Sequence, residues 1–319
     1  MGRGSQTFSV LIPALNEANN IGNLIYDVLE QELDDSLVLE KLLVVSDGST
    51  DDTNDIVMKC AAADNRVELT INPRRIGKPM SLNIGMRQVT SDFLVLLDGD
   101  VRLCLPQTLR NLLMGFDTDV GIVGGNPVPA DDSGSFAALV ARCGDILRND
   151  VFIRIRDGCN IFSAHGRIMA LSRQFYSTVE IPIEKDGRQM VSDDQYLYLS
   201  CIEKNLRYVY RGDAEVLYRL PTSFMDYLRQ SVRFMASFKE TTAFFDDTEV
   251  ASEYHIPFKI KAVAFTNLCR REPGGAFAWT LYRLIGRLLH TAKRLGFSKR
   301  VGTKWDVSKS TKEEIIGPR

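Results

Sequence analysis

The sequence predicts an α/β protein with a mostly parallel central sheet flanked by helices, and with a helical C-terminal extension. Two observations predict the sheet. Continuous apolar runs alternate with segments of helical spacing over the first 125 residues, and polar, turn-forming residues follow most of these runs. Such runs are typical of parallel strands that are buried on both faces. A third observation, a basic segment with helical spacing near the C-terminus, predicts the extension.

The strands and helices are expected in a regular order. In the first half, strands are predicted at 7–13, 41–46, 66–71, 92–97 and 119–125, with helices at 20–33, 52–63, 77–89 and 106–116. The pattern changes near residue 131. Beyond it we expect helices at 136–149, 193–205 and 223–245, and strands at 162–171, 207–210 and 214–218.

Length and charge restrict the class of protein. A chain of 319 residues exceeds a typical small domain, and 39 basic side chains nearly balance 41 acidic ones. A nucleic-acid-binding protein would usually carry a basic excess. We expect no signal peptide, because the first strand starts near Phe8, and no run of about 18 apolar residues predicts a transmembrane helix. The expected location is the cytoplasm.

Ligands of such sheets bind beyond the carboxyl ends of the strands. There the run "FLVLL" leads into Asp98, Gly99 and Asp100. Two carboxylates at this spacing can reach one divalent cation such as Mg²⁺, which prefers oxygen ligands. The alternative is an ordinary turn, because Asp and Gly are common turn residues.

Two further strand ends carry candidate ligands. In "SDGSTDDT", Asp47 can accept hydrogen bonds from a base or ribose, although the segment also suits a helix cap. In "NPRRIGKPMSLNIG", Gly77 and Lys78 start a predicted helix, whose N-terminus favours anions. The alternative is a solvated basic loop. Neither G-x-G-x-x-G nor the P-loop motif occurs at these turns, which argues against dehydrogenases and P-loop enzymes.

The second half contributes two more candidates. Asp193 and Asp194 precede an apolar helix, where they can cap it or supply a general base. Gln230 and Arg233 share one face of a predicted helix and are followed by Phe234. A pair at this spacing is also common on an ordinary helix surface.

Taken in order, the motifs "PALNE", "SDGSTDDT", "RRIGKPMSLNIG", "LLDGD", "SDDQYLY" and "RQSVRF" resemble glycosyltransferase family 2, over roughly residues 7–240. The resemblance implies the GT-A fold and a role for each matched residue. Nucleotide-sugar contacts are implied for Pro13, Asn16, Glu17, Asp47, Gly77, Lys78, Asn83, Asp98 and Asp100. Asp98 and Asp100 match the metal-binding D-x-D motif, with Asp100 as the more direct ligand of Mg²⁺ or Mn²⁺.

For the acceptor side, the resemblance makes Asp194 the catalytic base. Gln230 and Arg233 match the Q-x-x-R-W motif, which closes over the diphosphate and the acceptor. His165, Asp193 and Phe234 are placed near the acceptor, and for His165 a structural role is an equal alternative. Two residues depart from the family pattern: Ser46 replaces an Asp, and Phe234 replaces the Trp of the last motif. The loss of the indole N–H argues against a processive polymerase.

The resemblance thus implies an inverting transferase that moves a sugar from a nucleotide-diphospho-sugar to a hydroxyl of a glycan or lipid-linked glycan, as in polysaccharide biosynthesis. We expect a nucleotide-sugar-binding half at 1–130, an acceptor-binding and catalytic-base half at 131–240, and a helical extension at 241–319. Two alternatives remain open. One is a nucleotidyltransferase, although this sequence lacks the Gly-rich loop that is usual in that class. The other is a catalytically dead scaffold that binds nucleotide or carbohydrate.

The segment 276–300 combines apolar residues with Lys and Arg at helical spacing. A basic amphipathic helix can lie in the membrane interface, here at the inner face. The alternative is that it packs on the catalytic domain or on a second copy of the chain in a homo-oligomer.

Overall fold

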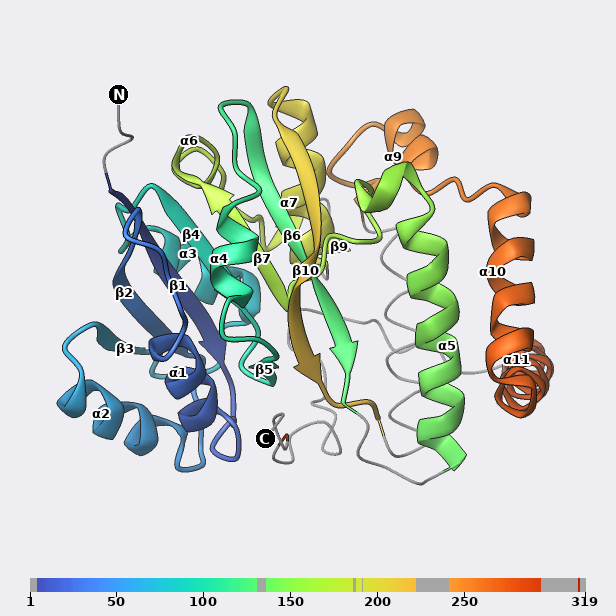
Figure 1. Ribbon diagram of the computed structural model, residues 1–319, viewed down its shortest axis with the longest axis horizontal. Helices are drawn as coiled ribbons and strands as arrows, with labels where there is room; N and C mark the ends of the chain where they lie inside the picture. Colours follow the sequence, from blue (N-terminus) through green and yellow to red (C-terminus); the bar gives the residue numbers. More distant parts are fainter. Residues whose placement is uncertain are drawn as a thin grey trace.

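The computed structural model describes residues 5–130, 136–185, 188–190, 192–221 and 241–293, together with Ile315. These residues form one large sheet with helices on both faces and a helical layer at one end (Figure 1). Within the described residues the sheet has eight strands, in the order β3-β2-β1-β4-β7-β6-β10-β5. The strands are β1 Gln6–Ala14, β2 Leu37–Ser46, β3 Val67–Ile71, β4 Phe93–Leu97, β5 Val101–Leu103, β6 Val120–Pro129, β7 Ile168–Ser172 and β10 Arg207–Tyr218.

The sheet is parallel on one side and mixed on the other. Strands β3, β2, β1 and β4 are parallel, and β7 then enters antiparallel between β4 and β6. Strand β10 runs parallel to β6, and the short β5 pairs antiparallel with β10. The carboxyl ends of β1, β2 and β4 therefore meet at one edge, and β5 starts there directly after Asp100.

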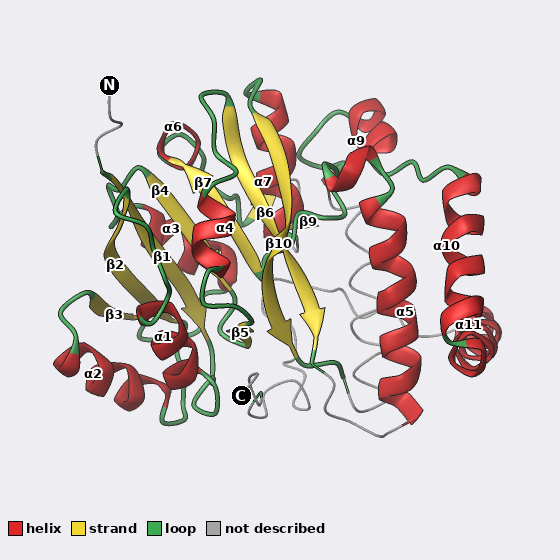
Figure 2. Ribbon diagram, viewed as in Figure 1, coloured by secondary structure: helices red, strands yellow, loops and turns green. Residues whose placement is uncertain are grey.

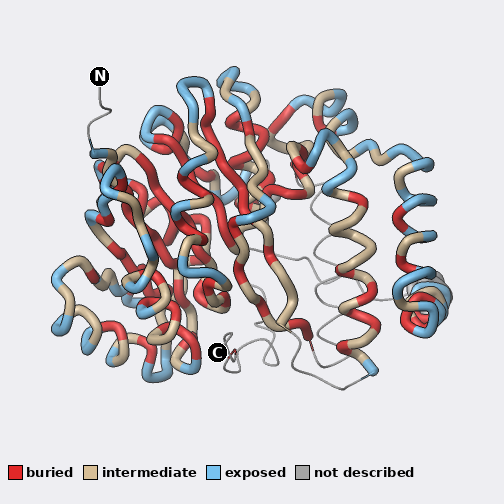
Figure 3. The backbone as a smooth tube through the Cα atoms, viewed as in Figure 1, coloured by how far each residue is buried: buried red, intermediate tan, exposed pale blue. Residues whose placement is uncertain are grey.

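Helices cover both faces of the sheet (Figure 2). On one face lie α1 Ile21–Leu29, α2 Thr53–Ala63 and α4 Thr108–Leu113, and on the other lie α3 Lys78–Met86, α6 Arg173–Tyr176 and α7 Asp193–Glu203. In β1, Val10 and Ile12 join the first core and Leu11 joins the second. Successive side chains of a strand point to opposite faces, so the apolar runs are explained by burial on both sides (Figure 3).

A helical layer follows at the end of the sheet. It consists of α5 Phe136–Ile153, α10 Phe258–Arg271 and α11 Pro273–Lys293, and the short helix α9 Asp247–Glu253 leads into it. Val140 of α5 packs with Ala278 and Tyr282 of α11, while Leu268 of α10 and Ala276 join Cys143. The predicted α/β class and helical C-terminal extension are confirmed.

Several predicted elements differ from those observed. The strand predicted at 162–171 is limited to Ile168–Ser172, because the preceding residues form turns that Asn160 stabilises through its side chain. The strands predicted at 207–210 and 214–218 are one strand, β10, with an irregularity between Tyr210 and Glu215. Strand β5, the turn η1 Arg156–Gly158 and the hairpin of β8 Glu184–Lys185 and β9 Arg188–Gln189 were not predicted.

Two further predictions concern a long helix at 223–245 and the absence of a transmembrane helix. Most of the helix predicted at 223–245 lies outside the described residues. In the described part of the chain, no helix combines the length and apolar character needed to span a bilayer.

Candidate active site

The site begins where the loops after β1 and β2 interlock. Asn16 adopts a left-handed backbone conformation with φ 54°. Its N–H donates to Ser49 Oγ at 3.1 Å, and its Oδ1 accepts from the Thr50 N–H at 2.8 Å. Ser46, which departs from the family pattern, bonds Ser49 Oγ at 3.0 Å. The serine thus stabilises this loop pair.

Asp47 holds the loop that leads into α3. Its carboxylate accepts from the N–H groups of Ile76 at 2.7 Å and Gly77 at 2.9 Å. The loop passes so close that a Cβ on Gly48, at φ +73°, would lie 2.6 Å from the Arg75 nitrogen. Asp47 therefore positions the start of α3, and its reading of a base stays a prediction.

The D-x-D loop after β4 is packed against the β1 loop. A Cβ on Gly99 would lie 2.8 Å from Glu17 Cγ, so only glycine leaves room for the buried Glu17 side chain. The Asn20 amide donates to the carbonyls of Gly99 at 2.9 Å and Val101 at 2.8 Å. These contacts explain why the smallest residue separates the two carboxylates.

Lys78 connects the two acidic motifs. Its Nζ lies 2.7 Å from Asp98 Oδ1 and 3.1 Å from Asp193 Oδ2. Desolvation acts to lower the pKa of Lys78, but the charges of Asp193 and Asp98 outweigh it and hold the pKa above its usual range. The ammonium therefore stays charged between residues that are 95 positions apart in the sequence.

Asp194 lies in the first turn of α7, beside this ion pair. Its Oδ2 accepts from the Gly166 N–H at 3.2 Å, and its Oδ1 accepts from the Gln195 N–H at 2.8 Å. Desolvation, together with the like charge of Asp193, raises the pKa of Asp194 to about 6. A carboxylate with this pKa is ionised at neutral pH and is a stronger base than an ordinary Asp.

Asp100 has a similar environment. Desolvation and the neighbouring charge of Asp98 raise its pKa to about 6, although Arg167 and Lys78 oppose the shift. The carboxylates of Asp98 and Asp100 fit a divalent cation, which would relieve the repulsion between their charges. Among the described residues, no group of three or more His, Cys, Asp or Glu side chains is placed to hold a metal. A cation at Asp98 and Asp100 would therefore need oxygens from water or a phosphate.

His165 and Arg167 lie in the loop before β7. Desolvation lowers the pKa of His165 to about 3, with smaller contributions from Arg167 and Arg148. The imidazole is neutral at physiological pH and is unsuited to act as an acid. The Arg167 guanidinium stacks over the Tyr218 ring at 3.8 Å from its centroid.

Some predicted site residues are placed elsewhere or are not described. Both polar atoms of the Asn83 amide bond the backbone of Ile181, at 2.7 and 2.9 Å. Pro13 pairs with Val45 near the end of β1. Gln230, Arg233 and Phe234 lie outside the described residues. The predicted site roles of all five residues stay predictions.

Sequence reasoning missed Asn20 and Arg167. Asn20 precedes α1, where an Asn is expected to cap the helix, and its side chain makes no cap hydrogen bond there. Arg167 follows the Gly166 that contacts Asp194, and no motif singles it out. Only the three-dimensional arrangement shows that both side chains lie beside the D-x-D loop.

Comparison with known proteins decides the family. The model of glycosyl transferase family 2 matches residues 9–179, which is more than half of the chain. The chain belongs to this family. The matched span includes Asp47, Lys78, Asp98 and Asp100 but ends before Asp193 and Asp194. The family 2 resemblance seen in the sequence is thereby confirmed, and so is the prediction that the protein is a glycosyltransferase.

Curated relatives agree over part of their length. The glycosyltransferase AglE of Haloferax volcanii is 34% identical over 121 residues, covering 37% of this chain and 38% of AglE. The putative glycosyltransferase CsbB of Bacillus subtilis is 27% identical over 112 residues, which is 34% of each chain. The match therefore spans little more than a third of these relatives.

Solved structures share the fold. The mannosyltransferase PcManGT from Pyrobaculum calidifontis, in complex with GDP-Man and Mn²⁺, superposes with a TM-score of 0.56 at 19% identity, covering 92% of this chain and 77% of PcManGT. Mannosyl-3-phosphoglycerate synthase from Rubrobacter xylanophilus gives a TM-score of 0.52 at 15% identity, covering 73% and 72%. At these identities the similarity shows the fold alone.

Proposed function

We propose that this family 2 enzyme is an inverting glycosyltransferase that transfers a sugar from a nucleotide-diphospho-sugar to an acceptor hydroxyl, with Asp194 as the general base. The observation that carries the proposal is the bridge formed by Lys78. Its ammonium forms ion pairs with Asp98 of the D-x-D motif and with Asp193, the neighbour of Asp194. This bridge supports a single site for the residues proposed to bind the donor and the residue proposed as the base.

The proposed step is one displacement. Asp194 accepts the proton of the acceptor hydroxyl as the oxygen attacks the anomeric carbon, and the bond from that carbon to the diphosphate breaks. The Gly166 N–H, which bonds one oxygen of Asp194, orients the carboxylate. Because attack and departure occur on opposite faces of the sugar, the anomeric configuration inverts. Lys78 places a positive charge near the leaving diphosphate.

A divalent cation, Mg²⁺ or Mn²⁺, would be held by Asp100 with Asp98 and would offset charge on the leaving diphosphate. The fold neighbour PcManGT was solved with GDP-Man and Mn²⁺, which supports the donor class and the ion. The acceptor is proposed to be a glycan or a lipid-linked glycan. In this scheme residues 1–130 bind the nucleotide-sugar, residues 131–240 bind the acceptor and carry the base, and residues 241–319 form the extension.

The charge distribution supports peripheral membrane contact through the extension. Between His255 and Arg300 the sequence holds ten Lys or Arg side chains and one acidic side chain, Glu272, whereas the rest of the chain holds 40 acidic and 29 basic ones. One side of α11 packs on α5, and Phe277, Leu281 and Leu284, spaced along another side, are exposed. Apolar side chains among cations suit a surface of anionic lipids.

Vesicle co-sedimentation tests this contact. We expect the full chain to bind vesicles rich in phosphatidylglycerol but not vesicles of phosphatidylcholine alone. The change Phe277→Ser with Leu281→Ser should abolish binding, while Tyr26→Ser, at a residue 63% exposed on α1, should not. Equal sedimentation of all three proteins, or none, would exclude a membrane surface at α11.

The function itself is tested by a donor screen. Thermal shift with UDP-, GDP- and TDP-sugars and Mn²⁺ should single out one nucleotide, because a ligand that binds the native state stabilises it. With that donor and candidate acceptors, the enzyme should release the nucleoside diphosphate. Release of inorganic pyrophosphate from a nucleoside triphosphate and a sugar phosphate would instead indicate a nucleotidyltransferase. Binding without any release would indicate a dead scaffold.

A further inference from the structure

The segment 241–254 lies against the helix that carries Asp194, and it lies beyond the matched family span. The Tyr254 hydroxyl donates to Gln195 Oε1 at 2.5 Å, and Gln195 directly follows Asp194. One turn further along α7, the Tyr198 hydroxyl donates to Glu253 Oε2 at 2.8 Å. The ring of Tyr196 adds contacts to Phe244 and Phe245, at 6.0 and 5.2 Å between centroids.

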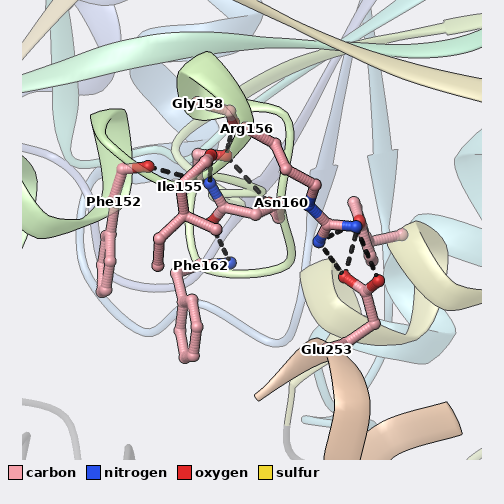
Figure 4. A network of polar contacts seen from close by, with 9 residues as sticks. Phe152, Ile155, Arg156, Gly158, Asn160, Phe162 and Glu253 are labelled. Carbon is pink, nitrogen blue, oxygen red and sulfur yellow. Dashed lines mark hydrogen bonds and ion pairs between the residues drawn. The ribbon is translucent and has the colours of Figure 1, made fainter. Parts of the chain in front are cut away.

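Glu253 and Tyr254 also contact the stretch 156–166, which ends beside Asp194. The Arg156 guanidinium donates to both carboxylate oxygens of Glu253 (Figure 4). The Tyr254 ring packs edge-on against Phe162, with centroids 5.5 Å apart. Arg156 and Phe162 belong to the stretch 156–166, whose last residue, Gly166, donates its N–H to Asp194. Glu253 and Tyr254 therefore contact both elements that meet at the base.

The stretch 156–166 begins with an unfavourable backbone conformation, which neighbouring contacts must stabilise. Arg156 and Asp157 both have φ 51°, and Gly158 has φ 84°. Consecutive left-handed residues other than glycine are unfavourable and persist only where surrounding contacts hold them. Asn160, fully buried, donates to the carbonyls of Phe152 and Ile155 at 2.8 Å each and accepts from the Phe162 N–H (Figure 4). The ion pair of Arg156 with Glu253 fixes the turn from outside.

We propose that Glu253 and Tyr254 are positioning residues of the transferase, which fix the orientation of the Asp194 carboxylate by holding α7 and the stretch 156–166 together. The inference rests on the proposed role of Asp194 as the base. The hydrogen bonds of these two positioning residues go to Gln195, Tyr198 and Arg156. Thr241 Oγ1 lies 3.4 Å from the Tyr254 hydroxyl, so Thr241 joins the same contact.

The test compares two tyrosine hydroxyls that each donate a 2.5 Å hydrogen bond, which is part-buried at Tyr254 and buried at Tyr176. Tyr254→Phe removes the bond to Gln195 but keeps the ring on Phe162. Tyr176→Phe, the control, removes the bond to the Ser91 carbonyl, before β4 and at the opposite end of that strand from Asp98. We expect Tyr254→Phe to lower kcat about tenfold with the donor KM changed less than about twofold, since small misplacements of a catalytic group are costly. Tyr176→Phe should leave kcat unchanged.

A second readout does not depend on catalysis. Amide hydrogen exchange should become faster in the peptides containing Gly166 and Gln195 in Tyr254→Phe, and in Glu253→Gln, but not in Tyr176→Phe. Unchanged exchange there, or equal kcat losses in Tyr254→Phe and Tyr176→Phe, would overturn the positioning role. If Asp194→Asn retains transfer, the base assignment fails instead, and the exchange result still decides whether the two residues hold the site.

Discussion

At the scale of single residues, Lys78 is the most consequential side chain of the site. It is the one described cation that forms ion pairs with both Asp98 and Asp193. Lys78→Met should reduce transfer at least about a hundredfold, because charge stabilisation of this kind is commonly worth that much. Steady-state kinetics checks the loss. Lys41→Met, which removes a surface ion pair with Glu68, is the matched control and should retain activity.

The raised pKa of Asp194 predicts an acid limb in the pH–rate profile. A base is active when deprotonated, so kcat at saturating Mn²⁺ should fall about tenfold per pH unit below about 6. The proton also competes with the cation at Asp100, whose pKa is raised to about 6 as well. Excess Mn²⁺ separates the two effects. A kcat that stays constant down to pH 4, the ordinary range of Asp, would contradict the assignment.

Residue types and their position were sufficient to predict three candidates, Asp98 and Asp100 after a strand and Asp194 at the start of a helix. They were not sufficient to predict which residues orient these side chains through hydrogen bonds and ion pairs. Asp47 accepts bonds from backbone N–H groups and Asn83 bonds the Ile181 backbone, and neither contact leaves a sequence signature. A polar side chain at a strand end can bind a ligand or hold a loop, and the spacing is the same for both.

At the scale of elements, the packing of α11 on α5 depends on one glycine. A Cβ on Gly275 would overlap Cys143 Sγ, whereas nothing lies within 4 Å of a Cβ on Gly274. Gly275→Ala should therefore destabilise the protein by about 1–3 kcal/mol through overpacking. Gly274→Ala, one residue away, should be neutral or stabilise by up to about 1 kcal/mol.

Denaturant unfolding of the two alanine variants checks this packing. The free energy of unfolding should fall for Gly275→Ala alone. Equal values would mean that α11 is not held closely against Cys143. Helical spacing predicted α11 from the sequence but left its partner open, because a mixed apolar and basic face suits both a helix and a lipid surface. The structure places one side of α11 on α5 and leaves Phe277 on another side exposed.

At the scale of the whole molecule, strand order decides which distant residues meet. The parallel strands β1, β2 and β4 were predicted, and their shared edge follows from that prediction. The approach of Asp193 to Lys78 was not predictable, because it depends on β7 entering antiparallel between β4 and β6 and on the turns before it. Those turns include left-handed residues at Arg156 and Asp157, and no signal in the sequence indicates that conformation at Arg156.

The most direct measurement is a comparison of Asp194→Asn with the unchanged enzyme, using the nucleotide found by the donor screen. Calorimetry should give nearly the same affinity for nucleotide with Mn²⁺, because Asp194 is assigned to the acceptor proton and not to the donor. Release of nucleoside diphosphate should be abolished. Transfer that survives in Asp194→Asn, or nucleotide binding lost in equal measure with transfer, would contradict the account.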